Sequence, residues 1–181
     1  MGPKPSNSSN RFIFTVVDKF SRFLFAFSVT GPSSSAAINC LSSLFTLFGP
    51  PNSIHSDRGK AFESNEFSAF LRNWNVIKTR TTPYHPQSNG QIEKMNGSLW
   101  KTVQLRLSQC GKLMTDWESE LSFALSNMRV LPSRSLSFAS PHSAFLAFER
   151  HITLEDPVIN ESSEPSISAP NWLRPGNNTY L

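Results

Sequence analysis

The sequence predicts a three-layer α/β domain, in which helices flank a mixed β-sheet. Two runs of β-branched and aromatic residues, Phe12–Asp18 and Phe23–Val29, are separated by only four residues, which favours an antiparallel hairpin. Helix and strand patterns then alternate as far as Arg80, and only helical patterns follow from Gln91 onward. A hairpin followed by alternating helices and strands is typical of a sheet covered by helices.

The first predicted helix lies between two breaks in the chain. Gly31-Pro32 ends the second strand, and the serines after it provide an N-cap. Apolar residues recur on one face of residues 36–48, and Gly49-Pro50-Pro51 ends the helix. A short strand, Ser53–Ser56, then leads directly to Asp57.

The remaining elements are predicted from periodicity in the same way. They are a short helix at 66–74, a strand at 75–80, a long helix from Gln91 to about Cys110, a helix at 116–130 and a helical turn at 141–148. The long helix has an apolar stripe at spacings of three and four, made by Ile92, Met95, Leu99, Val103 and Leu107. We expect residues 1–151 to form the core and residues 152–181, rich in Ser, Pro and Asn, to be a linker or tail.

The composition restricts the classes of partner and site. The 181 residues carry a formal net charge of +4, with a sequence pI near 9.3, which mildly favours an anionic partner. Cys40 and Cys110 stand alone without the spacing of metal ligands, so the sequence indicates neither a zinc site nor a disulfide scaffold. No apolar run in the sequence reaches the length of a membrane span, so we expect no membrane partner.

Two carboxylates and the segment between them carry the most specific signal. Asp57 begins the sequence Asp-Arg-Gly after the short strand, and Glu93 follows after the 35 residues 58–92. Residues 81–90 read Thr-Thr-Pro-Tyr-His-Pro-Gln-Ser-Asn-Gly, in which the prolines stiffen the chain and Ser-Asn-Gly is typical of a turn. Taken singly, Asp57 is explained as a turn-forming residue and Glu93 as a first-turn carboxylate favoured by the helix dipole.

In this order and at this spacing, the segments resemble the catalytic core of a retroviral or long-terminal-repeat retrotransposon integrase, most of all integrases of the Ty3 or Pao kind. The resemblance covers residues 2–151. More weakly, Trp172–Gly176 is similar to the lead-in to the C-terminal DNA-binding module of these integrases. The resemblance implies a ribonuclease-H-like fold, a reaction on DNA and an assembly that is at least dimeric.

The resemblance also implies a metal site. Phosphoryl transfer on DNA requires an aligned nucleophile and neutralised phosphate charge. Two Mg²⁺ or Mn²⁺ ions about 4 Å apart supply both, and such hard cations prefer carboxylate oxygens. Integrases of this family hold the ions with two Asp and one Glu. Asp57 matches the second Asp and Glu93 matches the Glu, so we predict that both are catalytic metal ligands.

The first Asp of the family pattern has no match in this sequence. In the family it lies on the first strand, just before a Gly-Pro similar to Gly2-Pro3, whereas Asp18 matches an acid at the end of the second strand. We predict that Asp18 is structural rather than a metal ligand. The resemblance implies that the central strand is missing, so each half of the sheet exposes an unpaired edge. We expect a marginally stable chain that is inactive as an integrase by itself.

The resemblance places DNA contacts on the segment before the long helix and on the solvent side of that helix. The predicted DNA-binding residues are Tyr84, His85, Gln87, Ser88, Asn89, Asn96 and Lys101. Tyr84 is explained equally well as a half-buried loop aromatic. For each helix residue taken singly, an ordinary solvated face is the slightly favoured explanation.

These observations favour the core fragment of a retrotransposon integrase that acts on element ends and target DNA, as a homo-oligomer and in the nucleus. The alternative is a non-catalytic relic or domesticated domain that binds DNA or a protein through the same fold. A ribonuclease-H-like nuclease is a weaker alternative, because the Pro-Tyr-His-Pro-Gln segment resembles integrases specifically.

Overall fold

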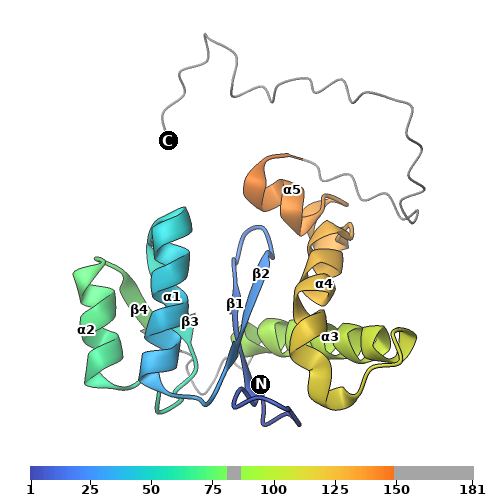
Figure 1. The fold of residues 1–181 in the computed structure, drawn as a ribbon. Coiled ribbons are helices and arrows are strands. Elements are labelled where there is room, and N and C mark those ends of the chain that lie inside the picture. Colours follow the sequence, from blue (N-terminus) through green and yellow to red (C-terminus); the bar gives the residue numbers. More distant parts are fainter. Residues whose placement is uncertain (81–86, 149–181) are drawn as a thin grey trace, which may run out of the picture. The chain divides into compact units, whose positions relative to one another are not determined.

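The structure, a computed structural model, describes residues 1–80 and 87–148, without the side chains of residues 87–89. Figure 1 shows how the strands and helices are arranged. In chain order, the elements are β1 (Phe12–Val17), β2 (Leu24–Val29), α1 (Ser34–Phe48), β3 (Ser53–Ser56), α2 (Asn65–Asn73), β4 (Ile77–Arg80), α3 (Gln87–Gln109), α4 (Trp117–Val130) and α5 (Pro141–Leu146). Two 3-10 helices, Met114–Asp116 and Arg134–Leu136, flank α4.

The strands β1 and β2 form the antiparallel hairpin that the sequence predicts, with all six residues of each strand paired. The turn between the strands is closed by Asp18. Its Oδ2 accepts the backbone N–H of Ser21 at 2.7 Å and the Ser21 hydroxyl at 2.6 Å. Arg22 follows with a φ of 61°, in the left-handed region that turns use. Asp18 therefore holds the hairpin turn.

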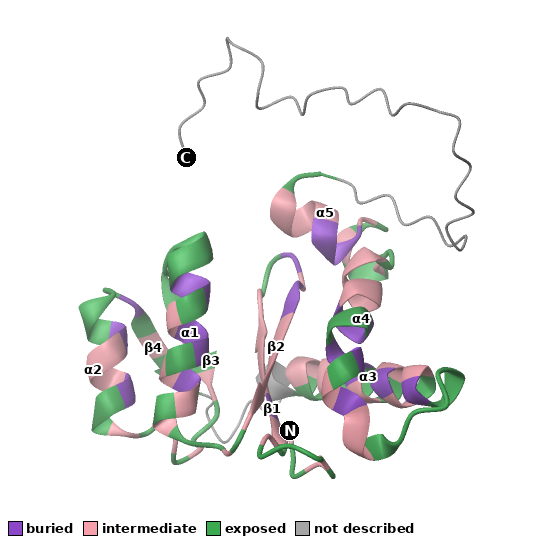
Figure 2. Cartoon of the chain, in the orientation of Figure 1, coloured by how far each residue is buried: buried purple, intermediate pink, exposed green. Residues whose placement is uncertain are grey.

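The two faces of the hairpin pack against different helices. On one face, Phe14 and Val16 pack on a core cluster that includes Leu41 of α1 and Phe67 of α2. On the other face, Ile13 is buried with residues of α3 and α4. Figure 2 shows the buried stripes that these helices turn inward. Because helices cover both of its faces, the hairpin is the middle layer of an α/β/α arrangement.

The strands β3 and β4 form a separate parallel pair, with Ser53 opposite Ile77 and Ser56 opposite Arg80. Ile54 of β3 packs on the same cluster as the hairpin's first face. The described residues therefore contain two two-stranded sheets and no strand pairing between them. Two sheet halves without pairing between them are what the sequence predicts.

The edge of β1 that faces away from β2 is partly covered by the start of the chain. Met1 and Ile13 exchange two backbone hydrogen bonds, each 2.7 Å long. Farther along this edge, Thr15 and Val17 have no recorded backbone partner on their outward side among the residues that the structure describes. This stretch of β1 is an open sheet edge.

Helix α3 begins at Gln87, four residues before the predicted start, so the prediction of a turn at residues 88–90 is wrong. Ser, Asn and Gly weaken a helix by only about 0.5–1 kcal/mol each. A 23-residue helix that packs along one stripe outweighs this cost. The buried part of the predicted stripe is Leu99, Val103 and Leu107. Within the described ranges, no helix combines the length and apolar character needed to cross a bilayer.

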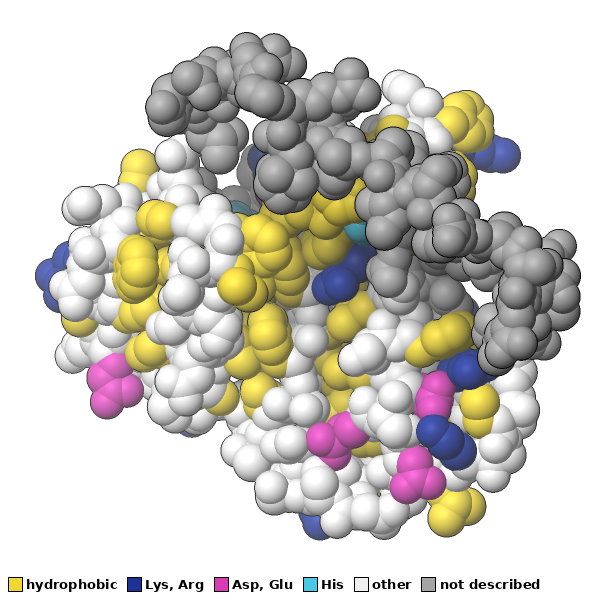
Figure 3. All heavy atoms as spheres, turned by 45° about the horizontal axis from the view of Figure 1, so that its top comes forward, with side chains coloured by type: hydrophobic (Ala, Val, Ile, Leu, Met, Phe, Trp, Pro, Cys, Tyr) yellow, Lys and Arg dark blue, Asp and Glu magenta, His cyan; other side chains and the backbone are white. Residues whose placement is uncertain are grey.

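Aromatic side chains attach α5 to the hairpin and to the end of α1. Phe145 stacks on Phe23 with ring centroids 4.7 Å apart and meets Phe48 edge-on at 5.3 Å. The guanidinium of Arg129, on α4, lies 4.3 Å from the Phe23 ring centroid and donates two hydrogen bonds to the Leu24 carbonyl. Phe48 stays 51% exposed, and Figure 3 shows hydrophobic side chains reaching the surface on this side of the molecule.

Candidate metal and nucleic-acid site

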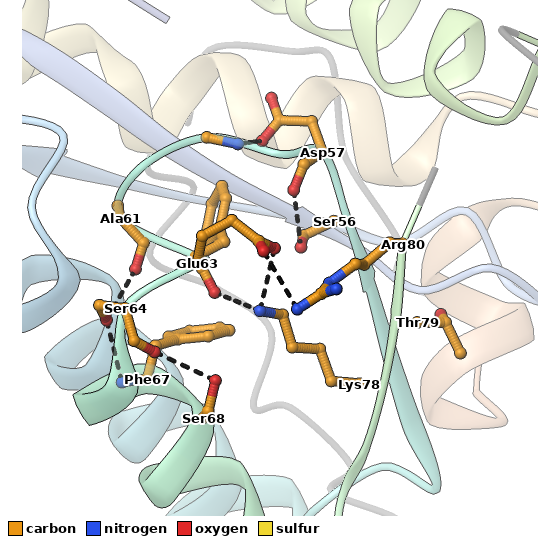
Figure 4. Close-up of polar contacts among 12 residues, drawn as sticks. Ser56, Asp57, Ala61, Glu63, Ser64, Phe67, Ser68, Lys78, Thr79 and Arg80 are labelled. Atoms are coloured by element: carbon orange, nitrogen blue, oxygen red, sulfur yellow. Dashed lines mark hydrogen bonds and ion pairs between the residues drawn. The ribbon is translucent and has the colours of Figure 1, made fainter. Parts of the chain in front are cut away.

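Asp57 lies at the carboxyl end of β3, where it is exposed to solvent. Its Oδ1 accepts the backbone N–H of Gly59 at 2.9 Å, as in an Asx turn. Figure 4 shows the carboxylate turned away from the cationic side chains of Lys78 and Arg80. No hydrogen bond or ion pair of Oδ2 is recorded among the described residues. One oxygen therefore serves the turn, and the other is available to a ligand.

The loop between β3 and α2 is closed by backbone turns and a helix cap. The Gly59 carbonyl accepts the N–H groups of Phe62 at 2.9 Å and of Glu63 at 3.1 Å. Ser64 is the N-cap of α2, and its hydroxyl oxygen accepts the N–H of Phe67 at 3.1 Å. These bonds leave the few residues between Asp57 and α2 little conformational freedom.

Glu63 connects this loop to β4 through two ion pairs, drawn in Figure 4. Its Oε1 lies 3.1 Å from Lys78 Nζ, and its Oε2 lies 3.0 Å from Arg80 Nη2. Lys78 Nζ also donates to the Phe62 carbonyl, and its side chain is only 13% exposed. The hydrogen bond from Lys78, aided by the charge of Arg80, lowers the pKa of the Glu63 carboxyl.

Sequence reasoning missed this cluster, although one signal for it was present. Lys78 and Arg80 are two residues apart on a strand, so both side chains project from the same face. Two cations on one strand face require a nearby anion or solvent. Finding Glu63 as that anion required knowledge of how the loop folds back along β4, which periodicity does not provide.

Glu93 lies in the second turn of α3, not in the first turn as predicted, because the helix begins at Gln87. No acidic residue is present in the first turn, and the favourable effect of the helix dipole falls off beyond that turn. Dipole capping therefore does not account for Glu93. Its side chain is exposed, and no hydrogen bond or ion pair is recorded for it in the described part of the chain.

Asn96 is half-buried, so its predicted place on the solvent side of the helix is wrong. It lies four residues after Ile92 and three before Leu99, which puts it on the apolar stripe. Its Oδ1 is buried without a hydrogen-bond partner. Such an atom costs about 1–3 kcal/mol, so it marks an unsatisfied polar position one helical turn from Glu93. Lys101 is exposed, as the prediction of a solvent-facing residue requires.

The other predicted DNA-binding residues fall wholly or partly outside the described residues. Tyr84 and His85 lie in the segment 81–86, which the structure does not describe. Gln87, Ser88 and Asn89 belong to the first turn of α3, and their side chains are not described. The roles assigned to these five residues stay predictions.

The structure does not bring the predicted ligands into one cluster. Among the described residues, no group of three or more His, Cys, Asp or Glu side chains could hold a metal ion, and no contact between Asp57 and Glu93 is recorded. The donors nevertheless suit a hard cation. Two exposed carboxylates retain oxygens without protein partners. These two carboxylates have the donor chemistry of a Mg²⁺ or Mn²⁺ site, although the described residues do not assemble one.

Comparison with known proteins identifies the family. Residues 2–86 match the family model of the integrase core domain, a stretch that includes Asp57 and ends before Glu93. The chain is 33% identical over 187 aligned residues to the Pro-Pol polyprotein of simian foamy virus type 1, covering 95% of this chain and 16% of that protein. It is 31% identical over 134 residues to the Pro-Pol polyprotein of feline foamy virus, covering 74% of this chain and 12% of that protein. The chain thus spans less than a fifth of the length of these relatives.

Solved structures share the fold. A chain of the simian T-cell lymphotropic virus intasome, in complex with PP2A regulatory subunit B56 gamma, superposes with a TM-score of 0.66 and 27% identity, over 81% of this chain and 52% of that one. The HTLV-2 integrase catalytic core domain, in complex with magnesium in a trimeric form, gives a TM-score of 0.62 over 73% of this chain and 82% of that one. Its identity is 22%, so it supports the fold alone. The fold is therefore ribonuclease-H-like, and the chain belongs to the integrase core domain family of the retroviral type.

Proposed function

We propose that this chain serves in DNA integration by divalent-metal-dependent polynucleotidyl transfer. In this reaction water trims the 3′ ends of an element's DNA, and the 3′ hydroxyls are then joined to target DNA. The observation that carries the proposal is the exposed Asp57 carboxylate at the carboxyl end of β3, inside the segment that matches the integrase core domain.

Asp57 and Glu93 are the proposed ligands of Mg²⁺ or Mn²⁺. When bound, two such ions activate the attacking oxygen and neutralise charge on the phosphate. The protein's part is to orient the carboxylates. The N–H of Gly59 fixes Asp57 Oδ1 and leaves Oδ2 outward, whereas α3 presents Glu93 from a regular helix. Both carboxylates lie at the surface, where a DNA strand can reach them.

The proposed partners are the element's DNA ends, target DNA and further copies of the chain. Arg58 and Lys60, both exposed beside Asp57, and Lys101, exposed on α3, can contact phosphate. The two matched structures, an intasome and a trimeric form of a catalytic core domain, support an assembly of several copies on DNA. A nuclear location follows from this function and stays a proposal.

The test compares DNA binding and strand joining with and without a metal ion. The chain is mixed with a labelled duplex that mimics an element end, in Mn²⁺, Mg²⁺ or EDTA. We expect metal to strengthen DNA binding about tenfold, and we expect Asp57→Asn and Glu93→Gln to remove this gain. Glu66→Gln is the matched control, because Glu66 is exposed on α2 and has no recorded ion pair among the described residues.

The outcomes separate the two functions that the sequence allows. Joined or trimmed products that disappear with Glu93→Gln would establish the transferase and overturn the expectation that the chain is inactive by itself. The transferase would be contradicted if DNA affinity is the same with and without metal and in both variants, and no product forms in any condition. That second result would support the non-catalytic binding domain.

A further inference from the structure

Glu63 links the loop that carries Asp57, the proposed metal ligand, to the neighbouring strand β4. It lies six residues after Asp57, and each of its carboxylate oxygens forms an ion pair with a cation of β4. Arg80 is the last residue of β4 and directly precedes the segment 81–90 in which DNA contacts are predicted. The Glu63 carboxylate therefore ties the loop of Asp57 to the end of the strand that leads into this segment.

Lys78 of β4 also holds Phe62, the loop residue next to Glu63, whose ring packs in the core. Its Nζ binds both the Glu63 carboxylate and the Phe62 carbonyl, so two consecutive loop residues are held from one point on β4. The Phe62 ring packs edge-on against Phe67 of α2 at 5.4 Å and lies 6.2 Å from Phe14 of β1. The middle of the loop is thus fixed on one side by apolar packing and on the other by charge.

The connection from Glu63 back to Asp57 is short. The N–H groups of Phe62 and Glu63 both donate to the Gly59 carbonyl, and the N–H of Gly59 donates to Asp57 Oδ1 at 2.9 Å. Two hydrogen bonds in series therefore separate the Glu63 backbone from the Asp57 carboxylate. A shift of Glu63 away from β4 would move Gly59 and release the oxygen that Gly59 holds.

The surroundings of Glu63 do not suit a metal ligand. Each of its oxygens is already paired with a cation, and the positive charges of Lys78 and Arg80 disfavour a metal ion at the same place. The hydrogen bond from Lys78 and the charges of Arg80 and Arg58 keep the pKa of the Glu63 carboxyl low, so the carboxyl remains ionised. Its role is to pair with β4.

We infer that Glu63 is a positioning residue, which holds the Asp57 loop against β4 and so sets the direction of the free Asp57 carboxylate oxygen. The inference rests on the proposed function in one respect, the role of Asp57 as a metal ligand. The attachment of the loop to β4 through Glu63 does not depend on that function. The sequence motif gives no indication of this role, because its turn-forming residues, Asp57 to Gly59, end before Glu63.

The experiment compares Glu63→Gln with the exposed-surface control Glu66→Gln in the full chain. Glutamine keeps the size of the side chain and removes its charge, so the ion pairs weaken without a new cavity. Amide hydrogen exchange is measured at Gly59, Phe62 and Glu63, with the buried core residue Val103 as a reference for global opening. Mn²⁺ affinity is measured by electron paramagnetic resonance, and the thermal midpoint by circular dichroism.

With Glu63→Gln, we expect exchange at the three loop amides to rise roughly tenfold while Val103 and the thermal midpoint change little. We expect Mn²⁺ affinity to fall about tenfold, as is usual when an outer partner of a metal ligand is lost. Arg80→Gln should produce part of the same effect, and the double variant should show less than the sum of the two. Glu66→Gln should match the unaltered chain at the loop amides and in Mn²⁺ affinity, and should lower the thermal midpoint only slightly, because Glu66 is a first-turn carboxylate of α2.

Three results would count against the inference or its premise, and they are distinguishable. Unchanged exchange at the loop amides overturns the attachment. Faster exchange with unchanged Mn²⁺ affinity overturns the positioning of Asp57. Failure of the unaltered chain to bind Mn²⁺, while Glu63→Gln still speeds loop exchange, overturns the proposed metal function and leaves the attachment intact.

Discussion

Oδ1 of Asp57 lies 2.9 Å from the backbone nitrogen of Gly59, and the same atom lies 2.9 Å from the position that a Cβ on Gly59 would occupy. The Asp57 carboxylate therefore occupies space that a side chain at position 59 would need. A side chain at residue 59 would require the Asp57 carboxylate to shift from this position. Residue 59 therefore affects where the Asp57 carboxylate lies.

Replacing Gly59 by Ala should disturb Asp57 more than it disturbs the fold. The added Cβ would displace the end of the Asp57 side chain, which moves at little energetic expense, whereas Phe62 at 3.4 Å would need to give only slightly. We expect Gly59→Ala to lower Mn²⁺ affinity about tenfold with little change in thermal midpoint. Calorimetric titration with Mn²⁺, together with thermal unfolding, checks both parts.

Gly97→Ala is the matched control for this prediction. Gly97 is exposed on α3, and a Cβ there meets nothing within 4 Å. We expect Ala to stabilise the protein by about 0.5–1 kcal/mol, because glycine is a poor helix former, and to leave Mn²⁺ binding unchanged. A Gly59→Ala variant that binds Mn²⁺ as tightly as Gly97→Ala would show that Asp57 does not need its turn.

Asp18→Ala should reduce stability without affecting metal binding. The Asp18 carboxylate accepts two hydrogen bonds from Ser21 across the hairpin turn, and bonds to a charged group in a half-buried position contribute about 1–2 kcal/mol together. Urea unfolding should show a loss of this size, and Asp18→Asn, which keeps an acceptor, should lose less. Mn²⁺ affinity that falls with Asp18→Ala at unchanged stability would instead make Asp18 a metal ligand.

Stability should depend on pH through Glu120, which joins α3 to α4. The carboxylate is buried, and its pKa is lowered first by the hydrogen bond from Lys112 and then by Arg106, whose Nε lies 3.1 Å from Oε2. A lowered folded-state pKa stabilises the protein above the ordinary value of 4.5, and this stabilisation is lost as pH falls through the lower, folded-state pKa.

Urea unfolding at pH 7 and at pH 3 therefore tests Glu120. The unaltered chain should lose more stability between these two pH values than Glu120→Gln does, because the variant has no carboxylate to protonate at this position. Glu66→Gln should follow the unaltered chain. Equal losses for Glu120→Gln and the unaltered chain would mean that the ion pairs of Glu120 contribute nothing to folding.

Much of the fold could be predicted because the relevant signals are local. The β-branched and aromatic runs predicted the hairpin, and the spacing of Leu99, Val103 and Leu107 predicted the buried face of α3. The start of α3 differs from the prediction because the length and packing of the helix outweigh the turn propensity of residues 88–90. This difference also places Glu93 in the second turn rather than the first.

The site was harder to predict because it depends on distant contacts. Asn96 is predicted on the solvent side of α3 but is half-buried, because its spacing of three residues from Leu99 places it on the apolar stripe of the helix. Glu63 could not be paired with Lys78 and Arg80 from the sequence, since the contact requires the loop to fold back on β4. Asp57 and Glu93 were singled out by their motifs, and their joint role stays a prediction.

The most direct test of the metal site is a double-mutant cycle of Mn²⁺ binding with Asp57→Asn, Glu93→Gln and both together, measured by electron paramagnetic resonance. If both carboxylates hold the same ions, each single variant should lose at least about tenfold in affinity, and the double variant should lose much less than the product of the two losses. Affinity that is unchanged by either single variant, or losses that multiply independently, would contradict a shared metal site.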